Sequence, residues 1–374
     1  MPLALAYPLR GQPSYMHQHG FDVLMVSADG KELPTLLQHE ICPHQVVPMT
    51  RKITPFRDLW AIFLLIKLFR RERPDIVHTE TPKAGLLGMI AAWLCGVNIR
   101  IHTVAGLPLM VEKGVKLAVL QWIEKITYGA ATNVWPNSQS LMNFIKAHRF
   151  TSFDKLRLIG EGSSNGVDTQ RFSRTALDPK ITETVKAELH YDPSLRYMLF
   201  VGRMVLDKGI VELVHVFLRV YEKDRSLRLI LAGNFEKSLD PLPQDIEDAI
   251  RNHPAIIHIS WTDRVEYYME LSSYFVFPSY REGFPNVLLE AALMKLPIVC
   301  SRIAGNVDIV THQQSGLLFE SQDEQALFDQ LSFALDHTDQ MQEMANRLYQ
   351  HVYHSFPREI FWEHMRQAYQ ELSA

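Results

Sequence analysis

Short β-branched runs alternate with longer helical patterns along most of this 374-residue chain. The first series of predicted strands covers residues 21–27, 75–79, 99–104, 132–135 and 155–159, with helices at 56–72, 84–95, 114–129 and 138–148. The second series has strands at 197–201, 227–232, 256–260, 274–278 and 297–301, with helices at 208–223, 242–252, 265–272 and 286–295. Such alternation is typical of βαβ units and parallel sheets. Each series suffices for one open, doubly wound sheet.

The length of the chain favours two domains, because a single hydrophobic core stops growing at about 250–300 residues. We therefore predict an α/β protein with two Rossmann-like domains that face each other across a cleft. The first domain is expected over residues 1–165 and the second over 166–355. The tail from Asp323 onward reads as helix, interrupted near Pro357, and its last part, 356–374, can pack back on the first domain.

Composition excludes several classes of protein. With 47% hydrophobic and 21% charged residues, the chain is neither disordered nor a coiled coil. Its three cysteines form no CxxC pair, which argues against a disulfide scaffold or a Cys-ligated zinc site and suits a reducing compartment. The longest apolar run, Leu59 to Ile66, is far shorter than the roughly 17–25 residues that cross a bilayer. The N-terminus lacks the features of a signal peptide, so we expect a cytoplasmic chain, with no nucleic-acid partner.

Charge is unevenly divided along the chain. Residues 1–165 hold 18 Lys and Arg against 12 Asp and Glu, whereas residues 166–374 hold 20 against 30. A basic first half and an acidic second half suggest that the two halves face different partners. Ordinary surface variation explains the same numbers, and charge alone does not separate these interpretations.

The loop between Phe200 and Gly209 follows a predicted strand, where open α/β sheets bind ligands. Gly202 permits a turn, and Arg203 and Lys208 project from the loop that opens the next helix. Two cations beside a helix N-terminus form an anion site, most naturally one for phosphate. The alternative is solvated surface charge.

A second loop follows the strand that ends near Pro278. It bears Glu282, a helix begins around Pro285 and Asn286, and Glu290 lies one turn inside that helix. Two carboxylates at this spacing can reach successive hydroxyl groups of one extended ligand, while the helix start attracts its anionic centre. Helix capping by Glu282 is the alternative.

These motifs closely resemble those of the retaining glycosyltransferases of family 4, which have the GT-B fold. The resemblance rests on FVGRMVLDKG, LAG, FVFPSYREGFPNVLLEAALMKLPIVCS and SGLLF, and the spacing of Glu282 and Glu290 matches the family's E-x7-E motif. It covers nearly the whole chain. The segments PDIVHTETPKAGLLG, IRIHTVAGLP and IGEGSSNGVDTQRF resemble the branch that builds bacterial capsule, O-antigen and lipid-linked oligosaccharides.

The resemblance implies a role for each matching residue. Arg203 and Lys208, beside Gly202, are expected to hold the donor diphosphate. Glu290 is expected to bind the donor ribose, and Glu282 the transferred sugar, where it orients the anomeric carbon. The loop that contacts the sugar and the β-phosphate through its backbone comprises Gly283, Phe284, Pro285, Asn286 and Val287.

The nucleotide base is expected near the end of the strand at 256–260. Trp261 sits where relatives of this family place the base, and Thr262 and Arg264 are candidate contacts with its edge. For Trp261 itself we predict packing in the core.

The first half departs from the family pattern in two places. Many relatives carry a histidine in a T-x-H-G stretch that faces the reacting sugar, but here Ala105 occupies that place. His102, three residues earlier, is a candidate contact, although a strand histidine is more often structural. Only ten residues precede Gly11, so the family's first strand is expected to be truncated or missing, and Gly11 is a candidate diphosphate or acceptor contact.

The resemblance implies a retaining transferase. A sugar would pass from a nucleotide diphosphate, with UDP expected, to a hydroxyl of a growing glycan, with a polyprenyl-diphosphate-linked acceptor expected. No side chain is placed as a covalent nucleophile, so front-face transfer is implied. We expect no metal cofactor, since His78 and Glu80 have no ligand set of the required spacing around them. A sugar-nucleotide 2-epimerase of the same fold, or an inactive sugar-nucleotide binder, remains as an alternative.

The predicted helix at 56–72 combines aromatic and basic side chains. This stretch joins Trp60, Phe63 and Phe69 to the basic residues Arg57, Lys67, Arg70, Arg71 and Arg73. Helices that lie in a membrane surface have this composition, so we expect a possible peripheral membrane contact. A core helix with a basic end is the alternative. Thr54 and Pro55 form its predicted start, and Pro74 follows its end.

Overall fold

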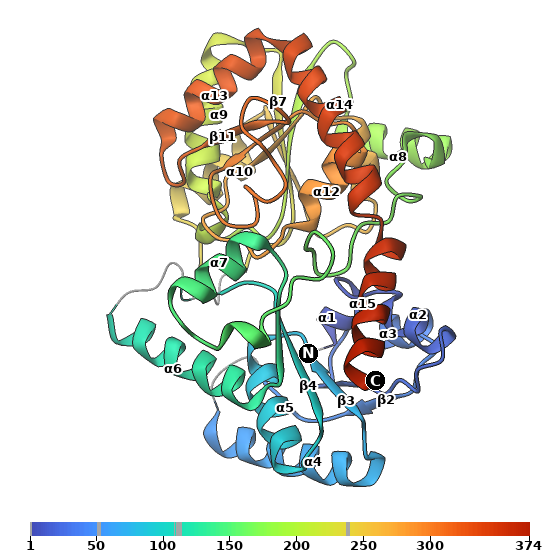
Figure 1. The fold of residues 1–374 in the computed structure, drawn as a ribbon. Coiled ribbons are helices and arrows are strands. Elements are labelled where there is room, and N and C mark those ends of the chain that lie inside the picture. Colours follow the sequence, from blue (N-terminus) through green and yellow to red (C-terminus); the bar gives the residue numbers. More distant parts are fainter. Residues whose placement is uncertain (1, 51–53, 108, 110–113, 237–239) are drawn as a thin grey trace. The chain divides into compact units, whose positions relative to one another are not determined.

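A computed structural model describes the whole chain except residues 1, 51–53, 108, 110–113 and 237–239 (Figure 1). The chain divides into two compact units. The first comprises Met1–Gly166 together with Arg358–Ala374, and the second comprises Val167–Pro357. The end of the chain therefore belongs to the same unit as its beginning.

The first unit contains two small parallel sheets. In one of them β1 (Met25–Ser27) pairs with β2 (His44–Val46), and in the other the order is β3 (Ile76–Thr79), β4 (Ile99–Val104) and β5 (Asn133–Pro136). Its helices before the second unit are α1 (Leu3–Ala6), α2 (Gln12–Gln18), α3 (Leu33–His39), α4 (Pro55–Glu72), α5 (Pro82–Leu94), α6 (Gly114–Ala130) and α7 (Gln139–Ala147).

Two strand predictions for this unit need correction. The predicted strand at 155–159 is wrong, because only Leu156 pairs, through a single bridge to Val134, before the chain turns at Gly160 and Gly162. The predicted strand at 21–27 is reduced to its last three residues, and the described residues before Gly11 contain helix α1 and no strand.

The last helix, α15 (Arg358–Ser373), completes the core of the first unit. Its Trp362 and Tyr369 are buried in one cluster with Ile101 of β4 and Trp135 of β5. Figure 1 shows α15, in red, beside the blue helix α2, and the two helices are in contact.

The second unit is built around one parallel sheet of six strands in the order β11-β10-β9-β6-β7-β8. The strands are β6 (Arg196–Val201), β7 (Leu227–Ala232), β8 (Ile256–Ile259), β9 (Tyr274–Phe277), β10 (Ile298–Ser301) and β11 (Leu317–Phe319). The helices are α8 (Pro179–Leu189), α9 (Ile210–Lys223), α10 (Gln244–Asn252), α11 (Val265–Glu270), α12 (Asn286–Leu293), α13 (Glu324–Asp336) and α14 (Thr338–Ser355). This order reverses direction between β6 and β9, as in a doubly wound nucleotide-binding sheet.

Candidate active site

The reversal of strand order fixes where a ligand of the second unit binds. β6 and β9 are neighbours in the sheet, and their connections leave on opposite sides. The crevice outside the carboxyl ends of two such strands is the usual ligand site of an open α/β sheet. Arg203 and Lys208 follow β6, and Glu282 follows β9, so these three residues lie at this switch point.

Glycines allow the loops at this point to approach each other. Gly209 has a φ of +68°, and a Cβ there would lie 2.2 Å from the carbonyl oxygen of Pro278. At Gly233, after β7, a Cβ would lie 1.8 Å from the carbonyl oxygen of Gly202. Any other residue would push these loops apart, because neither backbone oxygen can move away cheaply.

Lys208 and Glu282 form an ion pair that joins the two loops. The Lys208 ammonium contacts Oε1 of Glu282, and the hydroxyl of buried Ser279 donates to the same oxygen at 2.7 Å. The two charged side chains are only 14% and 16% exposed. A phosphate that binds Lys208 would compete with this carboxylate for the ammonium group, and a displaced Glu282 could accept a hydrogen bond from a ligand hydroxyl.

Arg203 has a different carboxylate partner. Its Nη1 donates to Oε2 of Glu236 at 3.0 Å, and both side chains are partly exposed. Within the part of the chain that the structure describes, Arg203 makes no hydrogen bond or ion pair to Lys208 or Glu282. The structure therefore brings Lys208 and Glu282 together and places Arg203 at the same strand end with a separate partner.

Glu290 projects from the middle of α12. Burial raises the pKa of its carboxyl to about 7, while the positive charge of Arg171 lowers it and the negative charge of Glu266 adds to the rise. Among the described residues no side chain donates a hydrogen bond to this carboxylate, so its oxygens can accept bonds from a ligand.

The loop before α12 is held rigidly. Gly283 and Pro285 are buried, and the Phe284 ring packs against Phe356 at a centroid distance of 5.5 Å. Val287 packs against the core of the second unit. The N-cap residue of α12, Pro285, makes no side-chain cap hydrogen bond, and its carbonyl accepts a bond from the Leu288 N–H at 3.0 Å.

The candidate base-binding residues differ from expectation in one respect. Trp261 is 55% exposed, so the prediction that it packs in the core is wrong. It lies just past the end of β8, beyond the layer of side chains that helices cover. Arg264 is paired with Glu188 of α8 at 3.0 Å, and the hydroxyl of Thr262 accepts a bond from the Arg264 N–H.

The candidates in the first unit lie in its interior. His102 is 2% exposed, its Nδ1 lies 2.9 Å from the Thr79 hydroxyl, and burial lowers its pKa to about 4. A Cβ on Gly85 would lie 2.3 Å from its ring. The Gly11 N–H donates to Glu40 at 2.6 Å, so Gly11 belongs to a turn held by its own unit.

At the ends of β3 and β4, His78 and Glu80 belong to a polar cluster whose other members, Thr103 and Tyr369, the sequence did not indicate. His78 lies 2.7 Å from the Thr103 hydroxyl, 2.5 Å from the Tyr369 hydroxyl and 3.2 Å from a Glu80 oxygen. Burial lowers the pKa of His78 to about 3 and raises that of Glu80 to about 8. Both groups are therefore mainly neutral at pH 7, so their contact is not an ion pair.

A metal site is not assembled by the side chains that the structure describes. Nowhere in this part of the chain do three or more His, Cys, Asp or Glu side chains gather in a group that could hold a metal ion. Independence from a metal stays a prediction.

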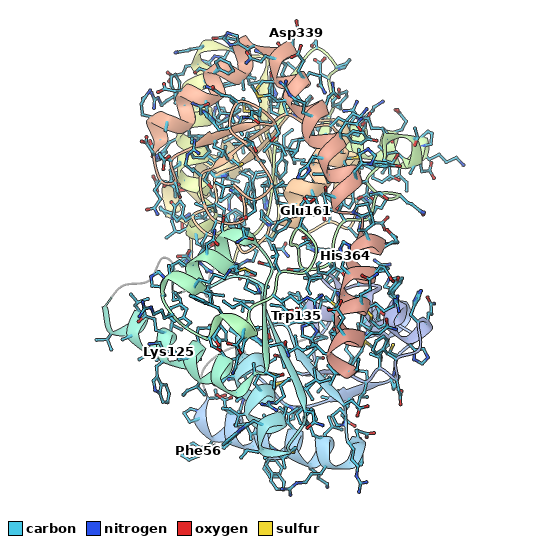
Figure 2. All side chains as sticks on the ribbon, in the orientation of Figure 1. Phe56, Lys125, Trp135, Glu161, Asp339 and His364 are labelled. Atoms are coloured by element: carbon cyan, nitrogen blue, oxygen red, sulfur yellow. The ribbon has the colours of Figure 1, made fainter. Side chains whose placement is uncertain are left out.

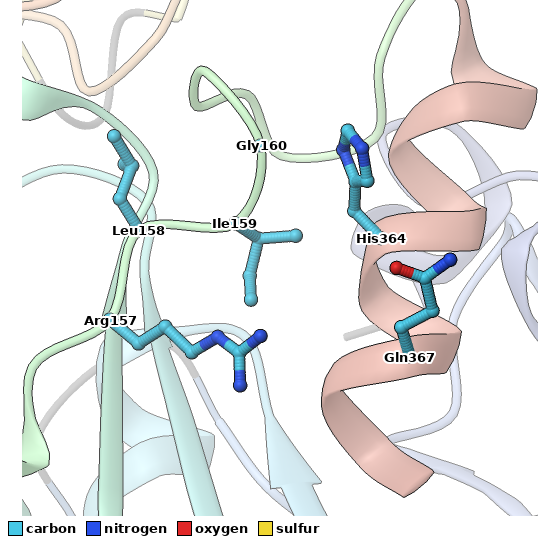
Figure 3. A pocket seen from close by; sticks show the side chains of 6 residues that line it. All are labelled: Arg157, Leu158, Ile159, Gly160, His364 and Gln367. Atoms are coloured by element: carbon cyan, nitrogen blue, oxygen red, sulfur yellow. The ribbon is translucent and has the colours of Figure 1, made fainter. Parts of the chain in front are cut away.

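A small polar pocket lies in the first unit, between α15 and the segment after β5 (Figure 3). The Arg157 guanidinium there is paired with Glu371 at 2.6 Å, so its charge is already compensated. The pocket is lined by Arg157, Leu158, Ile159, Gly160, His364 and Gln367. It shares no residue with the switch point of the second unit.

Comparison with known proteins identifies the family. The model for glycosyl transferases group 1 matches residues 196–337, and that for the glycosyl transferase 4-like domain matches residues 11–162. The chain is 33% identical over 361 residues to the capsular polysaccharide biosynthesis glycosyltransferase CapM of Staphylococcus aureus, covering 96% of this chain and 93% of CapM. The chain belongs to the group 1 glycosyltransferases.

Two further relatives support the fold of this glycosyltransferase. The Escherichia coli UDP-Gal:alpha-D-GlcNAc-diphosphoundecaprenol alpha-1,3-galactosyltransferase is 26% identical over 307 residues, 81% of this chain and 77% of that protein. The structure of Anabaena HepE in complex with UDP-glucose superimposes with a TM-score of 0.76 at 18% identity, covering 93% of this chain and 91% of HepE. The predicted family, enzyme class and GT-B fold with two Rossmann-like domains are confirmed.

Proposed function

We propose that this glycosyltransferase moves a sugar from a UDP-linked donor to a hydroxyl of a polyprenyl-diphosphate-linked glycan during synthesis of a bacterial surface polysaccharide. The observation that carries the proposal is the Lys208–Glu282 pair at the switch point between β6 and β9. The likeness to CapM supports the polysaccharide context, and the name of the E. coli relative supports both the donor and the lipid-linked acceptor.

The proposed donor site divides the nucleotide sugar among three elements. Arg203, Lys208 and the N-terminus of α12 hold the diphosphate and stabilise the negative charge that develops as it leaves. Glu290 accepts hydrogen bonds from the ribose hydroxyls. Glu282, released from Lys208, holds a hydroxyl of the transferred sugar and so orients its anomeric carbon.

The proposed transfer proceeds on one face of the sugar, with retention. The bond from the anomeric carbon to the diphosphate oxygen breaks as the acceptor oxygen forms its bond to the same carbon. The acceptor hydroxyl proton passes to the departing phosphate oxygen, so the protein supplies no covalent nucleophile. The diphosphate charge is compensated by the two cations and by α12, and no metal takes part.

A screen and a product analysis test this proposal. A thermal-shift screen of nucleotide sugars should find the donor, because a ligand that binds the folded state stabilises it by mass action. With that donor and an undecaprenyl-diphosphate-linked saccharide, proton NMR of the product should show the same anomeric configuration as the donor. An inverted product contradicts retention, and a 2-epimer formed without acceptor would establish the epimerase alternative.

We also propose that the first unit contacts the inner face of the cytoplasmic membrane through α4. Phe56 is 89% exposed, and Trp60, Phe63, Lys67 and Arg70 share its face of the helix. Figure 2 shows Phe56 on α4 and Lys125 on α6 at the edge of the first unit. On α6, which packs on the same neighbour α5, Trp122 is 65% exposed. No helix among the described residues is long and apolar enough to cross a bilayer.

Flotation with vesicles tests the membrane contact. Wild-type protein should float with vesicles that contain anionic lipid and much less with zwitterionic ones. Neutralising Arg70, Arg71 and Arg73 together should abolish the difference between the two vesicle types, and Trp60→Ser with Phe63→Ser should weaken binding to both. Equal flotation of wild type and all variants would disprove the contact.

A further inference from the structure

The segment that opens the second unit carries an arginine with no role in the proposed reaction. This arginine is Arg171, in the run Asp168-Thr169-Gln170-Arg171-Phe172. One carboxylate oxygen of Asp168 accepts hydrogen bonds from the N–H groups of Gln170 at 3.1 Å and Arg171 at 3.0 Å. This turn fixes the backbone of Arg171 and therefore the direction in which its side chain leaves.

The Arg171 guanidinium ties together the loop and helix that follow β8. Its Nη2 donates to Oε2 of Glu266, in α11, at 2.7 Å and also contacts the carbonyl oxygen of Asp263. Glu266 is buried, whereas the Arg171 side chain is 37% exposed. The loop held in this way is the one that bears the candidate base contacts Trp261 and Thr262.

The same guanidinium acts on Glu290. In the described structure, two charged groups shift the pKa of this carboxyl group. Arg171 lowers it and Glu266 raises it. Burial, Arg171 and Glu266 together bring the pKa of Glu290 into the neutral range, to about 7, and burial is the largest of the three causes. The balance between charged and neutral Glu290 near physiological pH is therefore sensitive to Arg171.

We propose that Arg171 is a positioning residue of the donor-nucleotide site: it holds the 261–266 loop in place and favours the ionised form of Glu290, whose carboxylate can accept two hydrogen bonds from the ribose. This proposal rests on the proposed role of Glu290 as the ribose ligand. A protonated carboxyl group would have to donate one hydrogen bond, and charged acceptors form stronger bonds than neutral ones.

Calorimetric titration with UDP between pH 6 and 9 tests the proposal. Wild-type affinity should weaken on the acid side as Glu290 takes up a proton. In Arg171→Gln the loss of UDP affinity on the acid side should begin at a higher pH, because the removed charge favoured the ionised carboxylate. At pH 7 the variant should bind UDP about five- to tenfold more weakly, and at pH 9 within about twofold of wild type.

Two variants separate charge from packing. Arg171→Lys keeps the charge, so its UDP affinity should fall at nearly the same acid pH as that of wild type, even if the loop is less well held. Arg174→Gln is the matched control, because Arg174 also pairs with a glutamate of α11, Glu270 at 3.0 Å, but does not act on Glu290. An equal loss of affinity at every pH in Arg171→Gln, or the same shift in Arg174→Gln, would overturn the proposal.

An NMR titration distinguishes failure of this inference from failure of the proposed function. With ¹³C-labelled glutamate carboxyl groups, and Glu290→Gln to assign the signal, the pKa of Glu290 should be higher in Arg171→Gln than in wild type. If that pKa is unchanged, the inference is wrong while the donor site stands. If it rises but Glu290→Gln binds UDP as wild type does, Glu290 is not the ribose ligand, and both proposals fall.

Discussion

Each cation that we assign to the donor diphosphate has a carboxylate partner in the structure. Lys208 is paired with Glu282, and Arg203 is paired with Glu236. Binding of a diphosphate is therefore an exchange of partners, in which phosphate oxygens replace carboxylate oxygens. Removing a cation has two effects, because it deletes a phosphate ligand and also leaves a carboxylate unpaired beside an anionic substrate.

Substitution of either cation should weaken the reaction strongly. A charge-assisted bond to phosphate contributes roughly 1.5–3 kcal/mol, so Arg203→Ala and Lys208→Ala should each lower kcat/KM about ten- to a hundredfold. The free-energy loss in the double variant should be smaller than the sum of the losses in the two single variants, because both side chains act on one ligand. Steady-state kinetics with and without magnesium measure this. Wild-type activity that vanishes in EDTA and returns with Mg²⁺ or Mn²⁺ would overturn the proposed diphosphate site.

Substitutions of the two carboxylates of the E-x7-E motif should change the kinetics in different ways. Glu282→Gln should lower kcat with little change in donor KM, since Glu282 orients the reacting sugar. Glu290→Gln should mainly raise the donor KM, through lost bonds to the ribose. Initial rates at varied donor concentration separate the two effects. Identical kinetics for both variants would show that the separate roles are wrong.

At the scale of elements, the ends of β3 and β4 carry a polar network with two oppositely perturbed groups. His78 has its pKa lowered to about 3, and Glu80 has its pKa raised to about 8. The stability that neutral His78 contributes is complete above its ordinary pKa of 6.5 and is lost as the pH falls toward 3. The stability that neutral Glu80 contributes is complete below its ordinary pKa of 4.5 and is lost as the pH rises toward 8.

Variants of these two residues should therefore show opposite pH dependence. The loss of thermal stability caused by His78→Gln should shrink as the pH is lowered from 7.5 to 5. The loss caused by Glu80→Gln should shrink as the pH is raised over the same range. Melting temperatures relative to wild type measure both effects, with exposed His148→Gln as the surface control. Parallel slopes for His78→Gln and Glu80→Gln would contradict the two pKa values.

Elements with long apolar runs could be predicted from the sequence, whereas short elements could not. The strands at 99–104 and 227–232 match the predicted bounds, and most of their residues are apolar or β-branched. The three-residue strands β2 and β11 and the helices α1 and α3 were not predicted, since such short segments show no clear periodicity. Helix α8 was also missed, although Asp178 before Pro179 is a start signal that could have found it.

The candidate site was predictable only in part. Glycines and charged residues after the strands identified Lys208, Glu282 and Glu290, because strand ends are where such sheets bind ligands. The partners of Glu282 and Arg203 were not predictable, since Ser279 and Glu236 reach them only through the folded loops. The contact of Arg171 with Glu266 spans 95 residues of sequence, and no local pattern indicates it.

At the scale of the whole molecule, the first unit is assembled from both ends of the chain. Trp362 of α15 is buried against Gly11, and its indole N–H donates to Asn165 at 2.6 Å. In the cluster around Trp362 and Tyr369, these two residues are therefore the part of the first unit's core that comes last in the sequence.

Trp362→Ala should destabilise the first unit selectively. Loss of a buried tryptophan costs about 3–5 kcal/mol, which should appear as an earlier unfolding transition, while UDP binding by the second unit is retained below that transition. Trp93→Ala, in the same unit but at an exposed position, should change stability by less than about 0.5 kcal/mol. Denaturation followed by tryptophan fluorescence and by UDP binding measures this. Simultaneous loss of both signals in Trp362→Ala would contradict independent cores.

The position of α15 also has a consequence for biosynthesis. A ribosome releases the chain from its N-terminus, so residues 1–166 emerge long before the helix that completes their core. The residues of the second unit are all available before α15 is, and that unit can finish folding first. The two halves can therefore mature in the reverse of their order in the gene, because the early half keeps an open hydrophobic face until α15 has emerged.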